Sequence, residues 1–300
     1  MEDQVIKYRK TLQKRIETDA RKLRKYYRNA LTKVQADIDR LYREAGTGDG
    51  KLDPQKVRAF SGKMTRLEAL RKQIITAVKE LEGKEYTLLS DRWAWEYQNA
   101  YYVHGFYLQA EAGIFVNTPL LTNQAVLAVA EIPWIGARFS DRIRKNTAFL
   151  AAKMEEVISQ AVVGGWSVQQ AAIEIKKRAN EGWYNATRLA RTELNRASAW
   201  GATELYRQNA DILDGKRWLA TLDRRTAVFD RSQDGRIFPI DAGGIPAHPN
   251  CRCIWAPVVS GLGVSTRSRI YRLNNRRDYT PARTYKDWAE SMGIPFEAAV

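Results

Sequence analysis

Residues 217–257 read RWLATLDRRTAVFDRSQDGRIFPIDAGGIPAHPNCRCIWAP and differ in character from the sequence before them. They contain both cysteines of the chain and one of its two histidines. Short apolar runs separated by Asp-Gly and Gly-Gly turns predict β-strands at 216–222, 236–240 and 253–258. We therefore expect a small domain here in which short strands accompany a helix.

The sequence upstream has a helical pattern. Apolar residues recur at steps of mostly three, four or seven over residues 4–43, which predicts a long amphipathic helix. A glycine-rich turn at 45–50 ends it, and Asp53 before Pro54 predicts the start of a second helix that continues to about Glu82. The two would form a long hairpin. The expected fold class is α+β and predominantly α-helical.

A helical middle region follows the hairpin. Residues 85–116 are rich in Tyr, Trp and Phe at helical spacing, and three interpretations stay open: a helix packed on several sides, a partner-binding surface, or a platform for stacking bases. Further helices are expected at 120–131, from Ser140 to about Val163, from Ser167 to about Ala179, and, after a break at Gly182, over 183–210. The predicted domains are 1–84, 85–139, 140–258 and 259–300.

Composition limits the class of protein. With 44% hydrophobic residues the chain of 300 residues can bury a substantial core, so wholesale disorder is not expected. No apolar run approaches the roughly 18 residues of a membrane span, and the charged N-terminus does not resemble a secretory signal. We expect a protein that folds in a cytoplasm with reduced cysteines.

A formal net charge of +15 indicates a polyanionic partner such as nucleic acid or an acidic protein surface. The basic tail at 259–300 is poor in apolar periodicity and is expected to be extended or partly disordered until bound. Its candidate contacts to DNA or another polyanion are Arg267, Arg269, Arg272, Arg276 and Arg277.

The Cys-rich segment offers a candidate zinc site. His248, Cys251 and Cys253 carry side chains that zinc prefers, and a closed structural site needs a fourth ligand. Asp230, Asp223 and Asp241 are the candidates for that position. The alternative is a tight turn, in which Pro249 and Asn250 shape the backbone and two small buried cysteines begin a strand.

Catalytic interpretations have less support. A Cys nucleophile with His248 as its base lacks any recognisable oxyanion arrangement. A magnesium-dependent nuclease or hydrolase would use the carboxylates of this region, although Asp is also common in turns. These carboxylates are Asp211, Asp214, Asp223, Asp230, Asp234 and Asp241. Phosphate-loop, GxGxxG and GxSxG motifs are absent from the sequence. We therefore expect no enzyme.

A polar motif precedes the strands on the last predicted helix. Arg191 and Glu193 are two residues apart, so they do not face each other. We expect each to pair outside the helix, with the charged turn at 223–226, or else to belong to a solvated face. A buried pair of this kind would fix the packing geometry more than it would stabilise the folded state.

Three features then follow in order: Ala-Arg-Thr-Glu at 190–193 with Asn195 to Ala197; a strand with Trp218 leading into Asp-x-Arg-Thr and Asp234-Gly235; and His-Pro-Asn-Cys-Arg-Cys at 248–253. Together they resemble the phage Mu F-like family of minor head proteins across about 140–258. Many members have Cys or His just after Arg-Thr, whereas this chain has Ala227 and Asp230. The structural motif residues carried over are Arg191, Glu193, Asp223, Arg225, Thr226, Asp234 and Gly235.

The resemblance implies a structural component of a phage head. Family members are associated with the portal and with head assembly, and some bind DNA or travel with it. It implies as partners the portal protein, proteins of the capsid interior and double-stranded DNA, and as location the capsid interior near the portal vertex, with host cytoplasm during assembly. Some relatives carry a fused ADP-ribosyltransferase domain, for which the residues after Pro257 are too few. The alternatives are a DNA-binding protein ejected with the genome and a metal-dependent hydrolase.

Overall fold

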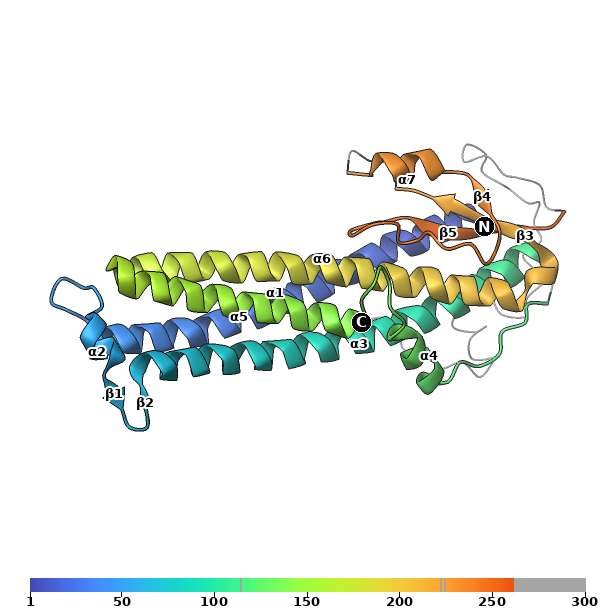
Figure 1. The fold of residues 1–300 in the computed structure, drawn as a ribbon. Helices are drawn as coiled ribbons and strands as arrows, with labels where there is room; N and C mark the ends of the chain where they lie inside the picture. The colour runs from blue at the N-terminus through green and yellow to red at the C-terminus, as the bar shows by residue number, and fades with distance from the viewer. Residues whose placement is uncertain (114, 222, 224, 262–300) are drawn as a thin grey trace. The chain divides into compact units, whose positions relative to one another are not determined.

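The computed structural model describes residues 1–113, 115–221, 223 and 225–261, and it is predominantly helical with a few short antiparallel strands (Figure 1). This confirms the expected fold class. In chain order the elements are α1 (Glu2–Ala45), α2 (Pro54–Arg58), β1 (Phe60–Ser61), β2 (Met64–Thr65), α3 (Arg66–Ala112), α4 (Asn123–Ala130), α5 (Phe139–Gly164), α6 (Val168–Gln208), the 3₁₀ turn Ala210–Ile212, β3 (Leu213–Leu219), α7 (Val228–Gln233), β4 (Ile237–Phe238) and β5 (Ile254–Val259).

The first helix is as predicted, but the second is not one continuous helix. Asp53 caps α2 through its carboxylate, which accepts from the backbone N–H groups of residues 55 and 56. The helix then stops at Arg58, and the hairpin β1–β2 follows, with Gly62 at φ 79° in its turn. A capping box of Thr65 and Glu68 starts α3. That Thr-x-x-Glu signal was overlooked in the sequence.

The long helices also continue past positions where breaks or starts were expected. α3 passes through residue 84 without interruption, and α6 passes through Gly182. A Cβ on Gly182 would lie 2.9 Å from Cε1 of Tyr27 and 3.2 Å from Cδ2 of Leu150, so this glycine serves close helix packing rather than helix termination. α5 begins at Phe139, which puts Ser140 inside its first turn, whereas Ser167 does cap α6 as predicted.

Contacts divide the chain into two compact units, each assembled from separated segments. Residues 17–89 and 133–190 form one, which we call the helical unit. Residues 1–16, 90–132 and the described chain from 191 onward form the other, which we call the mixed unit. The domain division expected from the sequence stays a prediction.

Parts of four helices make up the helical unit. Segments of α1, α3, α5 and α6 lie side by side and share one apolar core (Figure 1). The core includes Tyr27, Leu150 and Ile175. One carboxylate, Glu85 of α3, is fully buried in this unit and accepts a hydrogen bond from the hydroxyl of Tyr27 at 3.0 Å.

The mixed unit contains a three-stranded antiparallel sheet of order β4-β3-β5. Trp218 of β3 pairs with Trp255 of β5, and both side chains are buried. Aromatic residues of α3 complete the core, because Trp93, Tyr97, Tyr101 and Tyr102 of that helix are buried. Burial favours the packed-helix interpretation of the aromatic region over a partner-binding one. Of the described residues, none belongs to a helix long and apolar enough to span a membrane.

Candidate functional site

The candidate site begins on α7, a helix that the sequence analysis did not predict. Asp230 lies in its middle and is 2% exposed, while its neighbours Val228 and Phe229 are largely exposed. The helix therefore points a carboxylate inward and apolar groups outward. A buried carboxylate is costly unless charged or hydrogen-bonding groups surround it, so its surroundings are informative.

The His-Pro-Asn-Cys-Arg-Cys segment supplies those surroundings. Nε2 of His248 lies 2.9 Å from Oδ2 of Asp230, and Sγ of Cys251 lies 3.8 Å from the same oxygen. Cys253 completes the group: one ligand atom from each of Asp230, Cys251 and Cys253 lies within 4.8 Å of the others. Three of the four residues named as zinc ligands from the sequence thus lie together, and His248 contacts one of them, Asp230; we call the four the Asp-His-Cys cluster.

The protonation of His248 is constrained from both sides of its ring. Nδ1 lies 2.9 Å from the carbonyl oxygen of Pro249, so it carries a proton and donates it. Burial lowers the pKa of His248, but the bonds to Pro249 and Asp230 outweigh burial and raise the pKa above its ordinary value. The imidazolium form donates to Asp230 from Nε2. With a metal present, the same Nδ1 bond would orient a neutral ring whose Nε2 faces the ion.

The two thiols are coupled to each other. A hydrogen bond with Cys253 lowers the pKa of Cys251, and the same bond together with burial raises the pKa of Cys253. Cys251 is therefore the more easily deprotonated of the two thiols. Both side chains are about 1% exposed, so they are shielded from oxidants and bulk solvent.

The donor set fits zinc. Two sulfurs, one imidazole nitrogen and one carboxylate oxygen are ligands that zinc accepts in a closed tetrahedral site. The ligand atoms of Asp230, Cys251 and Cys253 already lie within 4.8 Å of one another, so these side chains need to move only slightly closer together to bind one ion. The carboxylate makes the site unusual, because structural zinc sites are mostly built from Cys and His. Asp223 and Asp241, the other candidates for fourth ligand, form ion pairs elsewhere.

α6 holds the Cys-rich segment in place. Oγ1 of Thr192 accepts from the backbone N–H of Asn250 at 3.0 Å, and Nδ2 of Asn195 donates to the carbonyl of Cys253 at 3.0 Å. Asn250 adopts φ 63°, the left-handed conformation that Asn tolerates, which reverses the chain before Cys251. The predicted motif at 190–197 is therefore an anchor for the cluster, although the role of Thr192 was not foreseen.

The prediction for Glu193 was wrong. Its carboxylate pairs with Nε of Arg196 at 2.8 Å on the same helix, and both side chains are buried. Arg196 also donates to the carbonyls of Ala130 and Ile132, each at 2.9 Å, so the pair joins α6 to the end of α4. The i,i+3 spacing of Glu193 and Arg196 was readable in the sequence.

The charged turn has a partner of its own. Asp223 receives two hydrogen bonds from the guanidinium of Arg252, at 2.5 and 2.6 Å, and this contact holds the pKa of Asp223 well below its usual range. The backbone N–H of Arg225 donates to the same carboxylate, and Thr226 closes the turn. The ion pair between Asp223 and Arg252 therefore binds the Cys-rich segment to the charged turn.

The second half of the motif also has a structural role. Oδ1 of Asp234 accepts from the backbone N–H of Ala220 at 2.8 Å, and the N–H of Gly235 donates to the carbonyl of Trp218 at 2.8 Å. Gly235 has φ 79°, which favours glycine at this turn. These bonds return the chain from α7 to the sheet.

The six carboxylates of the hydrolase interpretation do not gather around one point. Asp241 pairs with Arg207, Asp214 accepts from Ser260, and Asp223 and Asp234 are held as described above. Within the described ranges, Asp230 with the two cysteines is the only group whose spacing suits a metal ion. The hydrolase alternative therefore stays a prediction, which the contacts of Asp214, Asp223, Asp234 and Asp241 do not support.

The basic tail lies outside the described residues. Arg267, Arg269, Arg272, Arg276 and Arg277 all fall in it, so their role in contacting DNA stays a prediction.

Comparison with known proteins identifies related sequences. The family model described as "Phage Mu protein F like protein" matches residues 152–256. The chain is 24% identical to the minor head protein GP7 of Bacillus phage SPP1 over 267 residues, 82% of this chain and 84% of that protein. It is also 24% identical over 208 residues to NAD(+)–arginine ADP-ribosyltransferase EFV of Enterococcus faecalis (strain ATCC 700802 / V583); this match covers 64% of the chain and spans 42% of that protein. No solved structure matches significantly.

Proposed function

We propose that this chain, which matches the family described as "Phage Mu protein F like protein" through residues 152–256, is a structural component of a phage head that binds the portal inside the capsid and aids head assembly. One observation carries this proposal. The similarity to the SPP1 minor head protein extends over 82% of this chain and 84% of that protein, so it includes the helices before the matched domain.

We place no catalytic activity in the chain as described. The enterococcal transferase is similar over less than half of its own length, so its activity is not carried over. The polar groups of the motif are engaged in structural contacts: Asp223 binds Arg252, Glu193 binds Arg196, and Asp234 accepts from a backbone N–H. Their role is to join α6, the turn and the Cys-rich segment into one unit.

The Asp-His-Cys cluster is proposed to hold one structural zinc ion. His248, Cys251, Cys253 and Asp230 would be its ligands, and zinc would supply a crosslink between α7 and the start of β5. Such a crosslink suits a small sheet of three short strands, two of which are edges. Function then depends on the metal only through the fold of the mixed unit.

Portal binding is tested by co-expression with the portal protein of the same phage. Affinity purification through a tag on the portal should retain this protein at a constant ratio, and size-exclusion chromatography should keep the two together. Co-expression with the major capsid protein under the same conditions is the matched control and should give no retention. Recovery of portal alone would contradict the proposal.

DNA binding is a second candidate function, which the net charge of +15 favours. If it holds, the full-length chain binds double-stranded DNA with an affinity that falls steeply with salt. Replacing the five candidate arginines, Arg267, Arg269, Arg272, Arg276 and Arg277, with glutamine should then reduce both affinity and salt dependence. Equal affinity of the substituted and natural chains for DNA would show that these arginines do not contribute to DNA binding.

A further inference from the structure

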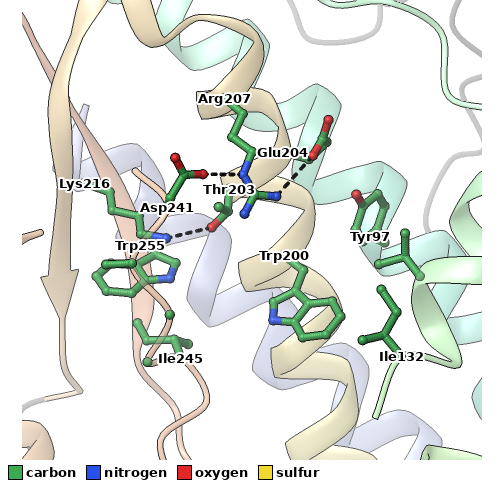
Figure 2. A pocket seen from close by; sticks show the side chains of 14 residues that line it. Tyr97, Ile132, Trp200, Thr203, Glu204, Arg207, Lys216, Asp241, Ile245 and Trp255 are labelled. Atoms are coloured by element: carbon green, nitrogen blue, oxygen red, sulfur yellow. Dashed lines mark hydrogen bonds and ion pairs between the residues drawn. The ribbon is translucent and has the colours of Figure 1, made fainter. Parts of the chain in front are cut away.

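A cavity of about 360 Å³ lies in the mixed unit, apart from the Asp-His-Cys cluster and from every residue of the recognised motif. Its wall comes from α6, from β3 and β5, from the loop that begins at Asp241, and from Tyr97 of α3, Val129 of α4 and Ile132 (Figure 2). The volume is at the lower end of the range for ligand pockets. Neither the proposed head function nor the zinc site uses it.

Lys216 is the most informative residue of this cavity. It lies on β3, in register with Phe238 and Pro257, and is 1% exposed. Its Nζ donates to Oγ1 of Thr203 at 3.2 Å and lies 4.4 Å from the ring centroid of Trp255. These are its contacts in the part of the chain that the structure describes, and no carboxylate is among them.

A buried ammonium group with only a hydroxyl and a ring face as partners is poorly compensated. Burial and the nearby charge of Arg207 lower the pKa of Lys216 to about 8, although the charge of Asp241 opposes the shift. An anion placed in the cavity would restore the missing countercharge.

The acidic groups of the cavity are already engaged. Arg207 at the mouth pairs with Asp241 at 2.7 Å and with Glu204 at 3.5 Å (Figure 2). Asp241 is largely exposed and forms its ion pair with Arg207, although its negative charge also acts on Lys216 and raises the pKa of that lysine. Asp241 and Glu204 together leave the mouth with one net negative charge around Arg207. Lys216 is the buried cation of the cavity, and its contacts in the described chain include no ion pair.

The remaining wall is flat and apolar. Trp200 and Trp255 flank the space, and Ile245 lies near Trp255 (Figure 2). Trp200 is held by Arg196, whose guanidinium carbon lies 4.7 Å from its ring centroid, and by an edge-to-face contact with Trp93. A ring fixed in this way offers a surface that is formed before any ligand arrives.

We propose that this cavity binds a small organic carboxylate, whose anionic group pairs with Lys216 while a flat or branched apolar body packs between Trp200 and Trp255. The carboxylate belongs either to a free small molecule or to the end of a partner peptide. Lys216 supplies charge recognition, and the two indoles supply shape.

The test uses three probes with one body and different charges: 3-phenylpropanoate, 3-phenylpropan-1-ol and 3-phenylpropylamine. Calorimetry and tryptophan fluorescence of the full-length protein should show saturable binding of the carboxylate, at least about tenfold weaker binding of the alcohol, and none of the amine. Because this comparison uses the natural chain, it does not depend on any variant folding. Equal binding of carboxylate and alcohol, or no saturable binding of the carboxylate, would overturn the proposal.

Lys216→Met keeps the apolar stem and removes the charge. It should weaken carboxylate binding by about tenfold or more and leave alcohol binding unchanged. Lys176→Met, an exposed lysine of the helical unit, is the matched control and should bind like the natural chain. Affinity for the carboxylate should fall as pH rises above about 8, because Lys216 then loses its proton. Unchanged affinity in Lys216→Met, with a native near-ultraviolet spectrum, would also overturn the proposal.

Peptides distinguish the two sources. A short peptide that ends in Phe with a free carboxylate is compared with the same peptide as its C-terminal amide. Tighter binding of the free-acid peptide than of 3-phenylpropanoate identifies the end of a partner chain as the ligand. Weaker binding identifies a free small molecule, and both results keep Lys216 as the recognition group.

Discussion

At the scale of single residues, Asp230 is the departure that matters most. The family pattern leads one to expect Cys or His just after Arg-Thr, and Asp230 stands in this region, buried against His248 and Cys251. Sequence spacing was sufficient to nominate His248, Cys251 and Cys253. It could not choose among Asp230, Asp223 and Asp241 for the fourth ligand. That choice depends on α7, which turns the carboxylate of Asp230 inward, and on the ion pairs that Asp223 forms with Arg252 and Asp241 with Arg207.

Zinc content tests this residue-level account. Protein purified anaerobically should retain about one zinc ion per chain, and Cys251→Ser should lose it, because a thiolate ligand is removed. Asp230→Cys should raise the affinity by about tenfold or more, since sulfur is the more usual ligand in structural sites. Elemental analysis and competition with a chromogenic chelator measure both.

Thermal unfolding tests whether the metal proposed at Cys251 and Cys253 stabilises the fold. Chelation should lower the thermal midpoint of the natural chain and leave that of Cys251→Ser unchanged, because the variant has no metal to lose. A natural chain without zinc whose midpoint does not respond to added zinc would contradict the assignment.

At the scale of elements, two glycines in long helices show what the sequence hides. The sequence predicts a helix break at Gly182, yet α6 continues through it, and a Cβ added there would meet the side chains of Tyr27 and Leu150. Gly83 lies within α3, and a Cβ added there meets nothing within 4 Å. Helical periodicity does not distinguish a glycine that ends a helix from one that lets another helix approach.

The two glycines therefore respond oppositely to alanine. Gly182→Ala should destabilise the protein by about 1–2 kcal/mol, because overpacking against the Tyr27 ring exceeds the gain in helix propensity. Gly83→Ala is the matched control and should stabilise by about 0.5–1 kcal/mol. Urea unfolding followed by circular dichroism gives both values. Stabilisation of similar size in both variants would show that α6 is not tightly packed at Gly182.

Glu85 gives the helical unit a dependence on pH. Burial raises the pKa of Glu85 to about 7, although the bond from Tyr27 opposes the shift. In the unfolded chain the carboxyl group ionises near pH 4.5, so between pH 4.5 and 7 the folded state binds more protons. Stability is greatest below that window and falls across it, by on the order of 3 kcal/mol.

Thermal unfolding at pH 5 and pH 8 measures this dependence. When the pH is raised from 5 to 8, the natural chain should lose stability relative to Glu85→Gln, and Glu85→Gln should be the more stable of the two proteins at pH 8, because its amide carries no charge to bury. The same change of stability with pH in both proteins would show that Glu85 is ionised without cost in the folded state.

At the scale of the whole molecule, the predicted fold class is confirmed, and the structure adds two compact units that are each assembled from separated segments. Three of the long helices, α1, α3 and α6, each contribute to both the helical and the mixed unit. Composition and turn signals divide a chain in order, whereas these units draw on segments far apart in sequence. The mixed unit brings together the first turns of α1, the aromatic half of α3 and the Cys-rich segment, which no linear reading would group.

The whole-molecule claim is that this protein is a structural part of a phage head, and its abundance in particles tests that claim most directly. Quantitative mass spectrometry would be applied to purified procapsids and mature virions of the phage that encodes it, with the portal and major capsid proteins measured in the same samples. The account predicts a low copy number at a constant ratio to the portal in both kinds of particle. Its absence from both, in samples where the portal is detected, would contradict the account.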